Sequence, residues 1–541
     1  MNASTDPQSY AELRKRVESE PLFKNLGELI DFSVACYSDK PAWISIDSDG
    51  RSLTYDEIGK LIAKSANSFA SMGVKKGSHV ALMMPSAPEH LCAWVALAKI
   101  GAVSIGINPN YTTKELGYTL VDSKAEYLLT ASKFLPNLET LLQNDCIAAQ
   151  KVAVWGSVTR PFHDWAAALD SADWEFKSDE VEVAGADPIN ILYTSGSTGF
   201  PKGCVLPHDY WVIKGKIVAN LWPETTRILC DAPFHYMGPL WRFAFACYLG
   251  AAIYVAPRAS LTRFVARWKE HKIDFGWINN AMAMTNAQES DSDNSLEVLG
   301  TSGISPTLQD AVEKRFGAKV REHYGMTEIG LAIVMPIDAD EMLGSGSCGL
   351  EAPFRECMIA DENGETVRCG EVGELCVRGL GIVKEYIGKP EANAQAFRGG
   401  WFRTGDLFWQ DENGYFYFNS RIKDIIRRSA ENISATEVET ALSTIGEVQE
   451  VAVGPVKDAM RGEEVKAFII LKPGHSSDSV NPEKIIEYCS QLLARYKLPR
   501  YFQYYSEFPK TSSNKIAKKL LLNGEGSAVT RTYDITSGTW D

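Results

Sequence analysis

Several features that mark common functional classes are missing from this chain of 541 residues. The 11 cysteines form no Cys-x-x-Cys pair and no Cys/His spacing typical of metal sites, so we expect reduced thiols. The net charge of −14 lacks the basic excess that phosphate backbones require, which argues against a nucleic-acid partner. The longest uncharged apolar run, residues 243–256, is shorter than the ~18 residues of a membrane span. The N-terminal residues also lack an apolar signal core, so we expect a cytoplasmic protein without a membrane span.

The sequence changes character twice along its length, and it is too long for one hydrophobic core. Up to about residue 345, helical patterns alternate with short apolar runs, as in doubly wound α/β sheets. One helix is expected between an N-cap at Thr54 and Gly73, and another is expected to turn at Gly250 into a strand. Residues 345–420 predict short hairpin strands, and an α+β pattern follows residue 421. The polar residues 524–541 are expected to be mobile.

Residues 193–203, YTSGSTGFPKG, combine three glycines and four Ser or Thr hydroxyls with Lys202, directly after an apolar strand pattern. A loop at the carboxyl end of a parallel strand is where α/β sheets bind ligands, and its N–H groups can form an anion nest. The composition therefore favours a polyphosphate ligand, with a flexible surface turn as the alternative. A second glycine-rich stretch, residues 344–349, matches G-x-G-x-x-G but follows no strand pattern, so no dinucleotide site is expected there.

Five further motifs carry candidate functional side chains. Glu328 follows a glycine and hydroxyls in YGMTE, a set that could hold Mg²⁺ beside phosphates. Asp406 in FRTGD could accept both hydroxyls of a ribose, and Lys423 in SRIKD lies where the sequence changes character. Lys515 follows a turn in PKTSSNKI, and His235 stands among aromatic residues in PFHYMG. Each of these motifs, taken alone, is also compatible with an ordinary loop, a charged surface or a core histidine.

Together and in this order, these motifs resemble those of the adenylate-forming superfamily of acyl-CoA synthetases, luciferases and peptide-synthetase adenylation domains, from about residue 25 to 522. Within it, the chain is most similar to carnitine-type and methylmercaptopropionate-type CoA ligases. The resemblance implies a large N-terminal domain, residues 1–420, of two doubly wound α/β subdomains and a β-subdomain at about 345–420. It also implies a hinge at 421–424 and a small, mobile α+β C-terminal domain at 425–541.

The activity implied by the resemblance has two steps. A carboxylic acid attacks the α-phosphate of ATP in the presence of Mg²⁺, which gives an acyl-adenylate and pyrophosphate. The thiol of coenzyme A then displaces AMP. Transfer to a carrier protein or another acceptor is one alternative, and a non-catalytic nucleotide-binding role is another. We expect a short or medium-chain acid with a polar tail, and the pocket aromatics could hold a cationic tail. The oligomeric state is left open, with a homodimer among the options.

The resemblance also assigns site residues in this sequence. The ATP and AMP site would comprise Thr194, Ser195, Gly196, Ser197, Thr198, Gly199, Lys202, Gly303, Ile304, Ser305, Glu322, His323, Tyr324, Gly325, Met326, Thr327, Asp406 and Arg421. The catalytic residues would be Lys515, Glu328 and His235, with Thr198 and Glu328 as the Mg²⁺ ligands and Lys423 at the hinge. The acyl pocket would comprise His235, Tyr236, Trp241, Trp277 and Gly325. Coenzyme A would contact Ser429, Ala430 and Glu431. Two positions depart from the family pattern, because Ala430 and Asn514 stand where glycine is common.

Overall fold

The computed structural model describes residues 7–144, 146–158, 161–176, 182–194, 201–428, 431–458, 461–511 and 515–540. The chain divides into two compact units. The first contains Met1–Cys357, Val377–Phe402 and Asn413–Phe416, and the second contains Met358–Cys376, Arg403–Glu412 and Tyr417–Asp541. The expected site residues Ser195, Gly196, Ser197, Thr198, Gly199, Ser429 and Ala430, together with Asn514, lie outside the described residues.

The first unit contains an eight-stranded sheet in the order β19-β9-β8-β4-β3-β5-β6-β7. Neighbouring strands are parallel from β8 to β7, whereas β9 runs antiparallel to both β8 and β19. The strands are β3 (His79–Met83), β4 (Val103–Gly106), β5 (Tyr127–Ala131), β6 (Val152–Trp155), β7 (His163–Asp164), β8 (Pro188–Thr194), β9 (Lys202–Pro207) and β19 (Glu385–Tyr386).

A second sheet of this unit runs in the order β2-β1-β11-β10-β12-β13-β14-β15-β16. It is parallel from β1 to β14, and β2, β15 and β16 are added antiparallel. The strands are β1 (Pro41–Ser45), β2 (Ser52–Thr54), β10 (Arg227–Cys230), β11 (Ala252–Val255), β12 (Phe275–Trp277), β13 (Val298–Thr301), β14 (Lys319–Met326), β15 (Gly330–Val334) and β16 (Ser347–Glu351).

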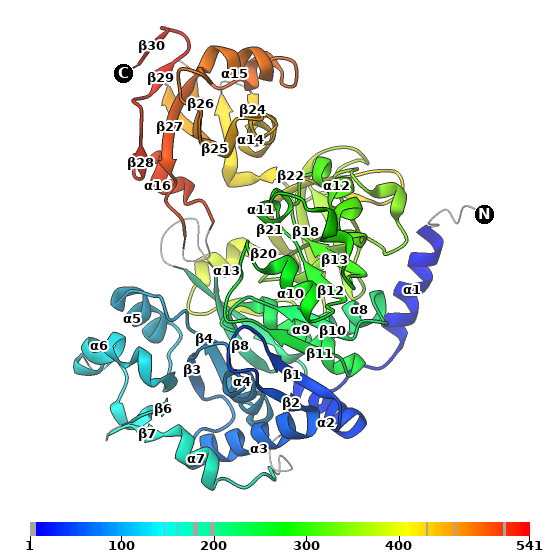
Figure 1. Ribbon diagram of the computed structural model, residues 1–541, viewed down its shortest axis with the longest axis vertical. Helices are drawn as coiled ribbons and strands as arrows, with labels where there is room; N and C mark the ends of the chain where they lie inside the picture. The colour runs from blue at the N-terminus through cyan, green and yellow to red at the C-terminus, as the bar shows by residue number, and fades with distance from the viewer. Residues whose placement is uncertain are drawn as a thin grey trace. The chain divides into compact units, whose positions relative to one another are not determined.

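Helices of the first unit alternate with these strands, and α8 packs directly against α9 (Figure 1). The helices are α1 (Pro7–Ser19), α2 (Leu26–Tyr37), α3 (Tyr55–Ser71), α4 (Pro88–Ile100), α5 (Thr113–Asp122), α6 (Glu139–Gln143), α7 (Trp165–Ser171), α8 (His208–Leu221), α9 (Met237–Leu249), α10 (Phe264–Glu270), α11 (Asn280–Ala283), α12 (Pro306–Phe316) and α13 (Pro390–Ala396). Within the described residues, no helix combines the length and apolar character that crossing a membrane requires.

Local sequence signals account for the ends of two of these helices. Thr54 and Glu57 form a reciprocal capping box at the start of α3, which satisfies backbone N–H groups that the helix leaves free. Gly250 follows α9 with φ of 64°, a left-handed conformation that favours glycine, and the chain then enters β11. The predictions that α3 begins at Thr54 and that the apolar run turns at Gly250 are confirmed.

The second unit contains a sheet in the order β24-β23-β26-β27-β29-β30, with β25 on β26 and β28 on β27. The strands are β23 (Ile425–Arg428), β24 (Glu431–Ser434), β25 (Val448–Asp458), β26 (Gly462–Leu471), β27 (Tyr501–Glu507), β28 (Ser527–Ala528), β29 (Tyr533–Asp534) and β30 (Thr539–Trp540). Its helices are α14 (Ala435–Ser443), α15 (Pro482–Cys489) and α16 (Lys518–Leu522). The strand order of the second sheet of the first unit continues from β16 to β22 (Phe416–Arg421), β21 (Trp401–Gln410), β18 (Gly373–Gly379) and β17 (Arg355–Ala360), each of which falls partly in the first unit and partly in the second. In addition, β20 (Phe397–Arg398) pairs with β21.

The expectation that residues 524–541 are mobile is wrong for the part that the structure describes. Three short strands lie there, and β29 pairs with β27. Tyr533 packs into the core of this unit, and Asp534 accepts hydrogen bonds from the Arg500 guanidinium at 2.8 to 3.3 Å. One buried ring and one ion pair therefore hold a segment whose composition is mostly polar.

Candidate active site

Glu328 lies in the tight turn that joins β14 to its antiparallel neighbour β15. The two strands approach closely at Gly325, where an added Cβ atom would lie 2.1 Å from the carbonyl oxygen of Gly330. Because only glycine fits, this position fixes the geometry of the hairpin. Tyr324 and Met326 belong to β14, and Thr327 follows it.

The Glu328 carboxylate is buried and held in place by neighbours from a distant part of the chain. The Tyr386 hydroxyl donates to Glu328 Oε1 at 2.8 Å, and the backbone N–H of Val383 donates to the Glu328 carbonyl at 2.6 Å. The Lys202 ammonium lies 4.8 Å from the centroid of the Tyr386 ring. The pairing of β19 with β9 thus brings Lys202 and Glu328 to the same ring, as the motifs predict. Tyr386 itself is a residue that the sequence did not single out.

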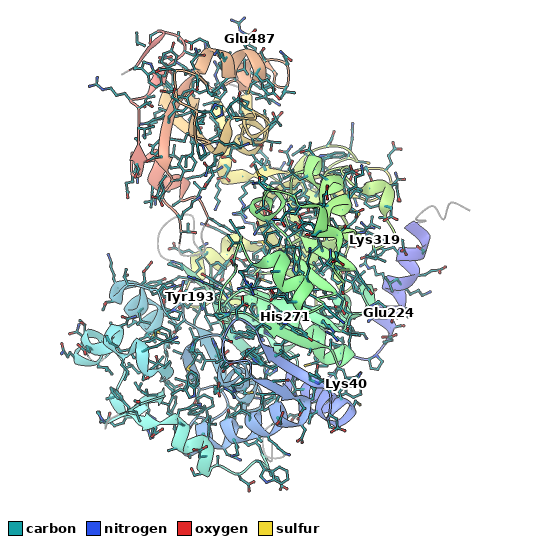
Figure 2. The ribbon with its side chains drawn as sticks, in the orientation of Figure 1. Lys40, Tyr193, Glu224, His271, Lys319 and Glu487 are labelled. Carbon is teal, nitrogen blue, oxygen red and sulfur yellow. The ribbon has the colours of Figure 1, made fainter. Side chains whose placement is uncertain are left out.

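Strands β8 and β9 enter and leave the expected phosphate loop. Tyr193, at the end of β8 (Figure 2), donates its hydroxyl hydrogen to Asp122 Oδ2 at 2.9 Å. The Thr194 hydroxyl lies 3.9 Å from Cys204 Sγ on β9. Burial, and then the nearby Glu328 carboxylate, raises the pKa of the Cys204 thiol, so this cysteine stays protonated. Thr194 and Lys202 therefore lie at the two ends of the loop, where Thr194 faces Cys204 and Lys202 faces the Tyr386 ring that holds Glu328.

The residues expected around adenine also come together. The Gly303 backbone N–H donates to Glu322 Oε1, while the other carboxyl oxygen of Glu322 is buried and has no hydrogen-bond partner in the part of the chain that the structure describes. Burial raises the Glu322 pKa to about 7. The Asn280 side chain donates to the Gly303 carbonyl at 3.1 Å and accepts from the Ser305 N–H at 2.9 Å. Gly303, Ile304 and Ser305 thus lie in one loop after β13, and Glu322 on β14 holds this loop through the Gly303 N–H.

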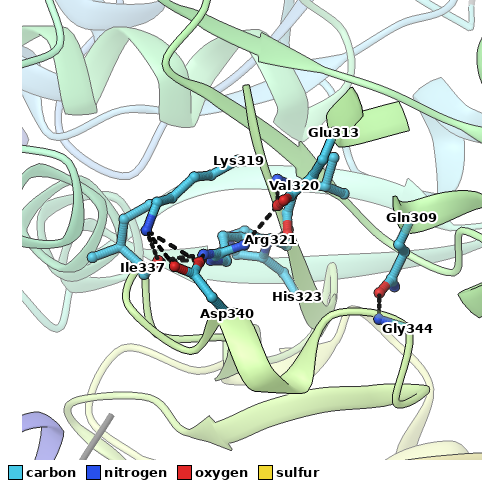
Figure 3. Close-up of polar contacts among 9 residues, drawn as sticks. All are labelled: Gln309, Glu313, Lys319, Val320, Arg321, His323, Ile337, Asp340 and Gly344. Atoms are coloured by element: carbon cyan, nitrogen blue, oxygen red, sulfur yellow. Dashed lines mark hydrogen bonds and ion pairs between the residues drawn. The ribbon is translucent and has the colours of Figure 1, made fainter. Parts of the chain in front are cut away.

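A buried arginine braces the strand that carries these groups (Figure 3). Arg321 is 1% exposed and donates to Glu313 Oε1 and, through Nε, to the Ile337 carbonyl, each at 2.9 Å. It also forms an ion pair with Asp340. These contacts tie β14 to α12 and to the segment after β15, so they hold the register of Glu322 and His323.

A cavity of about 400 Å³ opens beside this hairpin. Its lining includes Trp241, Trp277 and Gly325, which the sequence assigned to the acyl pocket, and also His323. His235 and Tyr236, assigned to the same pocket, are not among its lining residues. His235 is buried, and this burial lowers its pKa to about 3, so its imidazole is neutral.

Two cationic residues of this cavity are absent from the sequence-derived assignment. Lys214 on α8 and Arg242 on α9 both line it, and both are buried. Arg242 interrupts an otherwise apolar helix, and Lys214 stands with Lys216 among the apolar residues of α8. A charge within such a stretch is the signal by which the sequence could have revealed them.

The remaining predicted residues lie in the second unit. Arg421 Nε is 3.3 Å from Asp406 Oδ1, so the two expected ribose contacts are adjacent. Lys515 is open to solvent on one side, but the protein atoms around its ammonium displace water and lower its pKa. Arg421 lowers the Lys515 pKa further and Asp406 opposes this. Lys423 lies in the short 3₁₀ turn Ile422–Asp424, and Glu431 begins β24.

Comparison with known proteins identifies the family. Residues 30–387 match the family model of the AMP-binding enzymes, and residues 437–515 match that of the AMP-binding enzyme C-terminal domain. The chain belongs to the adenylate-forming AMP-binding enzymes. A crotonobetaine/carnitine–CoA ligase of Salmonella paratyphi B is 30% identical to this ligase over 523 residues, which cover 92% of this chain and 99% of the relative.

Solved structures agree with this assignment at the level of the fold. An anthranilate CoA ligase in complex with anthranoyl-AMP superposes with a TM-score of 0.82 at 24% identity, over 94% of this chain and 98% of that one. A fatty acyl CoA synthetase of Mycobacterium tuberculosis gives a TM-score of 0.69 at 26% identity, over 93% and 98% of the two chains. The predicted α/β fold, the family, the reaction class and the use of ATP, Mg²⁺ and coenzyme A are confirmed for this acyl-CoA ligase.

Proposed function

We propose that the ligase forms its acyl-adenylate around the Glu328–Tyr386–Lys202 arrangement, the observation that supports this site most directly. The phosphates of ATP would meet Lys202 and the 194–199 loop, while Gly303–Ser305 and Glu322–Thr327 would surround adenine and the α-phosphate. Asp406 and Arg421 would hold the ribose. In such a reaction the protein mainly positions the reactants and stabilises developing charge.

The residues present fit a magnesium ion. Mg²⁺ prefers oxygen ligands and usually takes one or two carboxylates, with phosphates and water completing its shell. Glu328 supplies one buried carboxylate, fixed by Tyr386, and Thr198 would supply a hydroxyl. Among the described residues, no group of three or more His, Cys, Asp or Glu side chains could hold a metal ion, in keeping with a site that nucleotide phosphates complete. When bound, the ion would neutralise phosphate charge.

Lys515 is the proposed catalytic cation of the first half-reaction. Its ammonium would stabilise the charge that develops on the α-phosphate, and rotation of the C-terminal domain, residues 425–541, about Lys423 would then remove it. Residues 1–420 would form the N-terminal domain, with residues 421–424 as the hinge. The proximity of Arg421 and Asp406 to Lys515 supports its place near the nucleotide.

The half-reactions test this assignment separately. Lys515→Ala should slow pyrophosphate release by about 10²–10³-fold, because one charge-stabilising group is lost. The same variant should still convert supplied acyl-adenylate to the thioester at a rate near that of the wild type. An equal loss in both half-reactions would remove Lys515 from this role.

Coenzyme A is the acceptor that we propose for the second half-reaction, with contacts from Ser429, Ala430 and Glu431. Acyl-CoA formation and pyrophosphate release over a panel of acids, with and without coenzyme A, test this, because a carrier-protein ligase would release pyrophosphate but form no acyl-CoA. A cavity of about 400 Å³ supports a short or medium-chain acid rather than a long one. We further propose that the ligase is cytoplasmic, where its cysteines would stay reduced, and that it acts as a homodimer.

A further inference from the structure

The cavity beside the β14–β15 hairpin holds two cations that the described part of the chain does not neutralise. Lys214 is 7% exposed and Arg242 is 6% exposed, and both line the cavity. Neither forms an ion pair or a hydrogen bond within the described residues, and Arg242 Nε is buried without a partner. Buried cations without counter-charges are costly, so an arrangement of this kind needs a specific compensation.

Close helix packing directs both cations to the same cavity. Lys214 precedes Gly215 on α8. A Cβ atom added to Gly215 would lie 2.9 Å from the carbonyl carbon of Ala244 on α9. Only glycine allows this approach, so α8 and α9 pack tightly. Lys214 and Arg242 therefore converge from two helices, and burial, and then the Arg242 charge, lowers the pKa of Lys214 to about 7.

The aromatic rings of the cavity stabilise the two cations only in part, and both rings already contact a cation of the protein. The Lys214 ammonium lies 5.0 Å from the ring centroid of Trp241. The Arg242 guanidinium carbon lies 5.1 Å from the ring centroid of Trp241 and 5.6 Å from that of Trp277. A cation–π contact gives roughly 0.5–2 kcal/mol. A cationic acyl tail would compete for the same ring faces, would meet the Arg242 charge and would favour the neutral form of Lys214, whereas an anionic tail would favour its charged form.

The other polar groups of the cavity do not supply the missing negative charge. Among the described residues that line the cavity, Asp231 is the one carboxylate, and its Oδ2 lies 4.0 Å from Arg267 Nη1. Arg267 also donates to Asp47 Oδ2 at 2.9 Å, and within the described residues no ion pair joins Asp231 to Lys214 or Arg242. His323 is neutral, since burial lowers its pKa to about 4, and its Nδ1 hydrogen-bonds the Arg321 carbonyl at 2.8 Å. The cavity thus keeps an excess of positive charge.

We infer that the acyl pocket selects an acid whose tail carries a second negative charge, with a short or medium-chain dicarboxylate as the leading class. The inference rests on the proposed acyl site, in which the reacting carboxylate lies toward Gly325 and the tail reaches Lys214 and Arg242. The planar guanidinium of Arg242 can bind a carboxylate through two parallel hydrogen bonds, and Lys214 adds a point charge. A neutral tail would leave both cations uncompensated and would displace the water that solvates them.

Pyrophosphate release with matched acids tests the selection. The pairs are butanoate and succinate, pentanoate and glutarate, and hexanoate and adipate. An acid with a sulfonate tail and one with a trimethylammonium tail complete the panel. The dicarboxylate should exceed its matched monocarboxylate in kcat/KM by at least about tenfold in one or more pairs, since pockets built around charged hydrogen bonds reject analogues that lack them. The sulfonate-tailed acid should also be adenylated. If only carboxylate-tailed acids are preferred, the selectivity depends on the planar shape of the carboxylate as well as on its charge.

Variants assign the selectivity to the two cations. Arg242→Met and Lys214→Met should each lower the dicarboxylate-to-monocarboxylate ratio of kcat/KM by about tenfold, and Arg242→Lys should restore part of it. Lys216→Met is the matched control on α8. The Lys216 ammonium donates to the carbonyls of Glu20 and Pro21 at 2.8 and 3.2 Å, so this variant should leave the ratio unchanged.

The possible failures are distinguishable. Equal or better use of the monocarboxylate in every pair, or a preference for the trimethylammonium tail, would overturn the inference and leave the proposed ligase activity intact. An unchanged ratio in both methionine variants would overturn the assignment to Lys214 and Arg242. A lack of pyrophosphate release with every acid would overturn the proposed function, and this inference with it.

Discussion

At the scale of single residues, Glu322 couples the loop after β13 to pH. Its carboxyl group has a pKa of about 4.5 when exposed and about 7 in the folded protein, because burial disfavours the charged form. The unfolded chain therefore loses this proton at lower pH than the folded chain, and the free energy of unfolding falls as the pH rises from about 4.5 to about 7. Below about pH 4.5 the Glu322 carboxyl group does not lower the free energy of unfolding, and above about pH 7 its contribution no longer changes with pH.

Substitution of Glu322 by glutamine should remove this pH dependence while keeping an oxygen for the Gly303 N–H. Relative to the wild type, Glu322→Gln should gain about 3 kcal/mol in free energy of unfolding between pH 4.5 and pH 7. Urea unfolding of both proteins at several pH values between 4.5 and 8 measures the difference. A constant difference across this range would show that Glu322 does not titrate there.

The Tyr386 hydroxyl offers a second test at the residue scale, because Tyr386→Phe removes one donor to Glu328 and keeps the ring under Lys202. A hydrogen bond to a charged group is worth about 1.5–3 kcal/mol, so kcat/KM for Mg-ATP should fall at least about tenfold. Tyr127→Phe is the control. Tyr127 lies on β5 of the same sheet, and its hydroxyl donates to the Gly73 carbonyl at 3.0 Å. If both variants have the same kinetic effect, Tyr386 has no specific role in positioning Glu328.

At the scale of elements, the β14–β15 hairpin depends on the absence of a side chain at Gly325. Gly325→Ala would place a Cβ atom against the Gly330 carbonyl, so the strands must separate and move Glu328. We expect a loss of stability of about 1–3 kcal/mol, as for overpacking, and a loss of adenylation that exceeds what the stability change explains. Gly446→Ala is the matched control, because nothing lies within 4 Å of an added Cβ there and its backbone is not left-handed. Wild-type activity in Gly325→Ala would contradict this account.

Among the elements, some features were predictable from the sequence and others were not. Helix caps, strand order along the chain and the motifs around Glu328 follow from local patterns, so α3, the turn at Gly250 and the α/β class were predictable. The contact of Tyr386 with Glu328 depends on β19 pairing with β9, far apart in sequence, and no local signal encodes that pairing. Lys214 and Arg242 look like isolated charges in apolar helices until α8 and α9 bring them to one cavity. Their position favours an anionic tail over the cationic tail that the aromatic residues alone could hold.

At the scale of the whole molecule, the proposed two-step reaction requires the turn Ile422–Asp424 to change its backbone conformation. Ile422 begins this 3₁₀ turn, and Arg421 before it is extended, with ψ of 140°. Proline suits the first position of such a turn and favours an extended preceding residue, so Ile422→Pro should fold and should hold the turn in its present form. One half-reaction should then proceed normally, while the other slows at least about tenfold because it requires a different form.

The matched control is Ile422→Ala, which removes the same partly exposed side chain but leaves φ free. Pyrophosphate release and thioester formation from supplied acyl-adenylate are measured separately for both variants. Because a compatible proline also restricts the unfolded chain, the thermal stability of Ile422→Pro should equal or exceed that of Ile422→Ala. Loss of one half-reaction in the proline variant alone would identify the turn as the hinge. If the proline variant keeps both half-reactions at the rates of the alanine variant, the rotation does not depend on this turn.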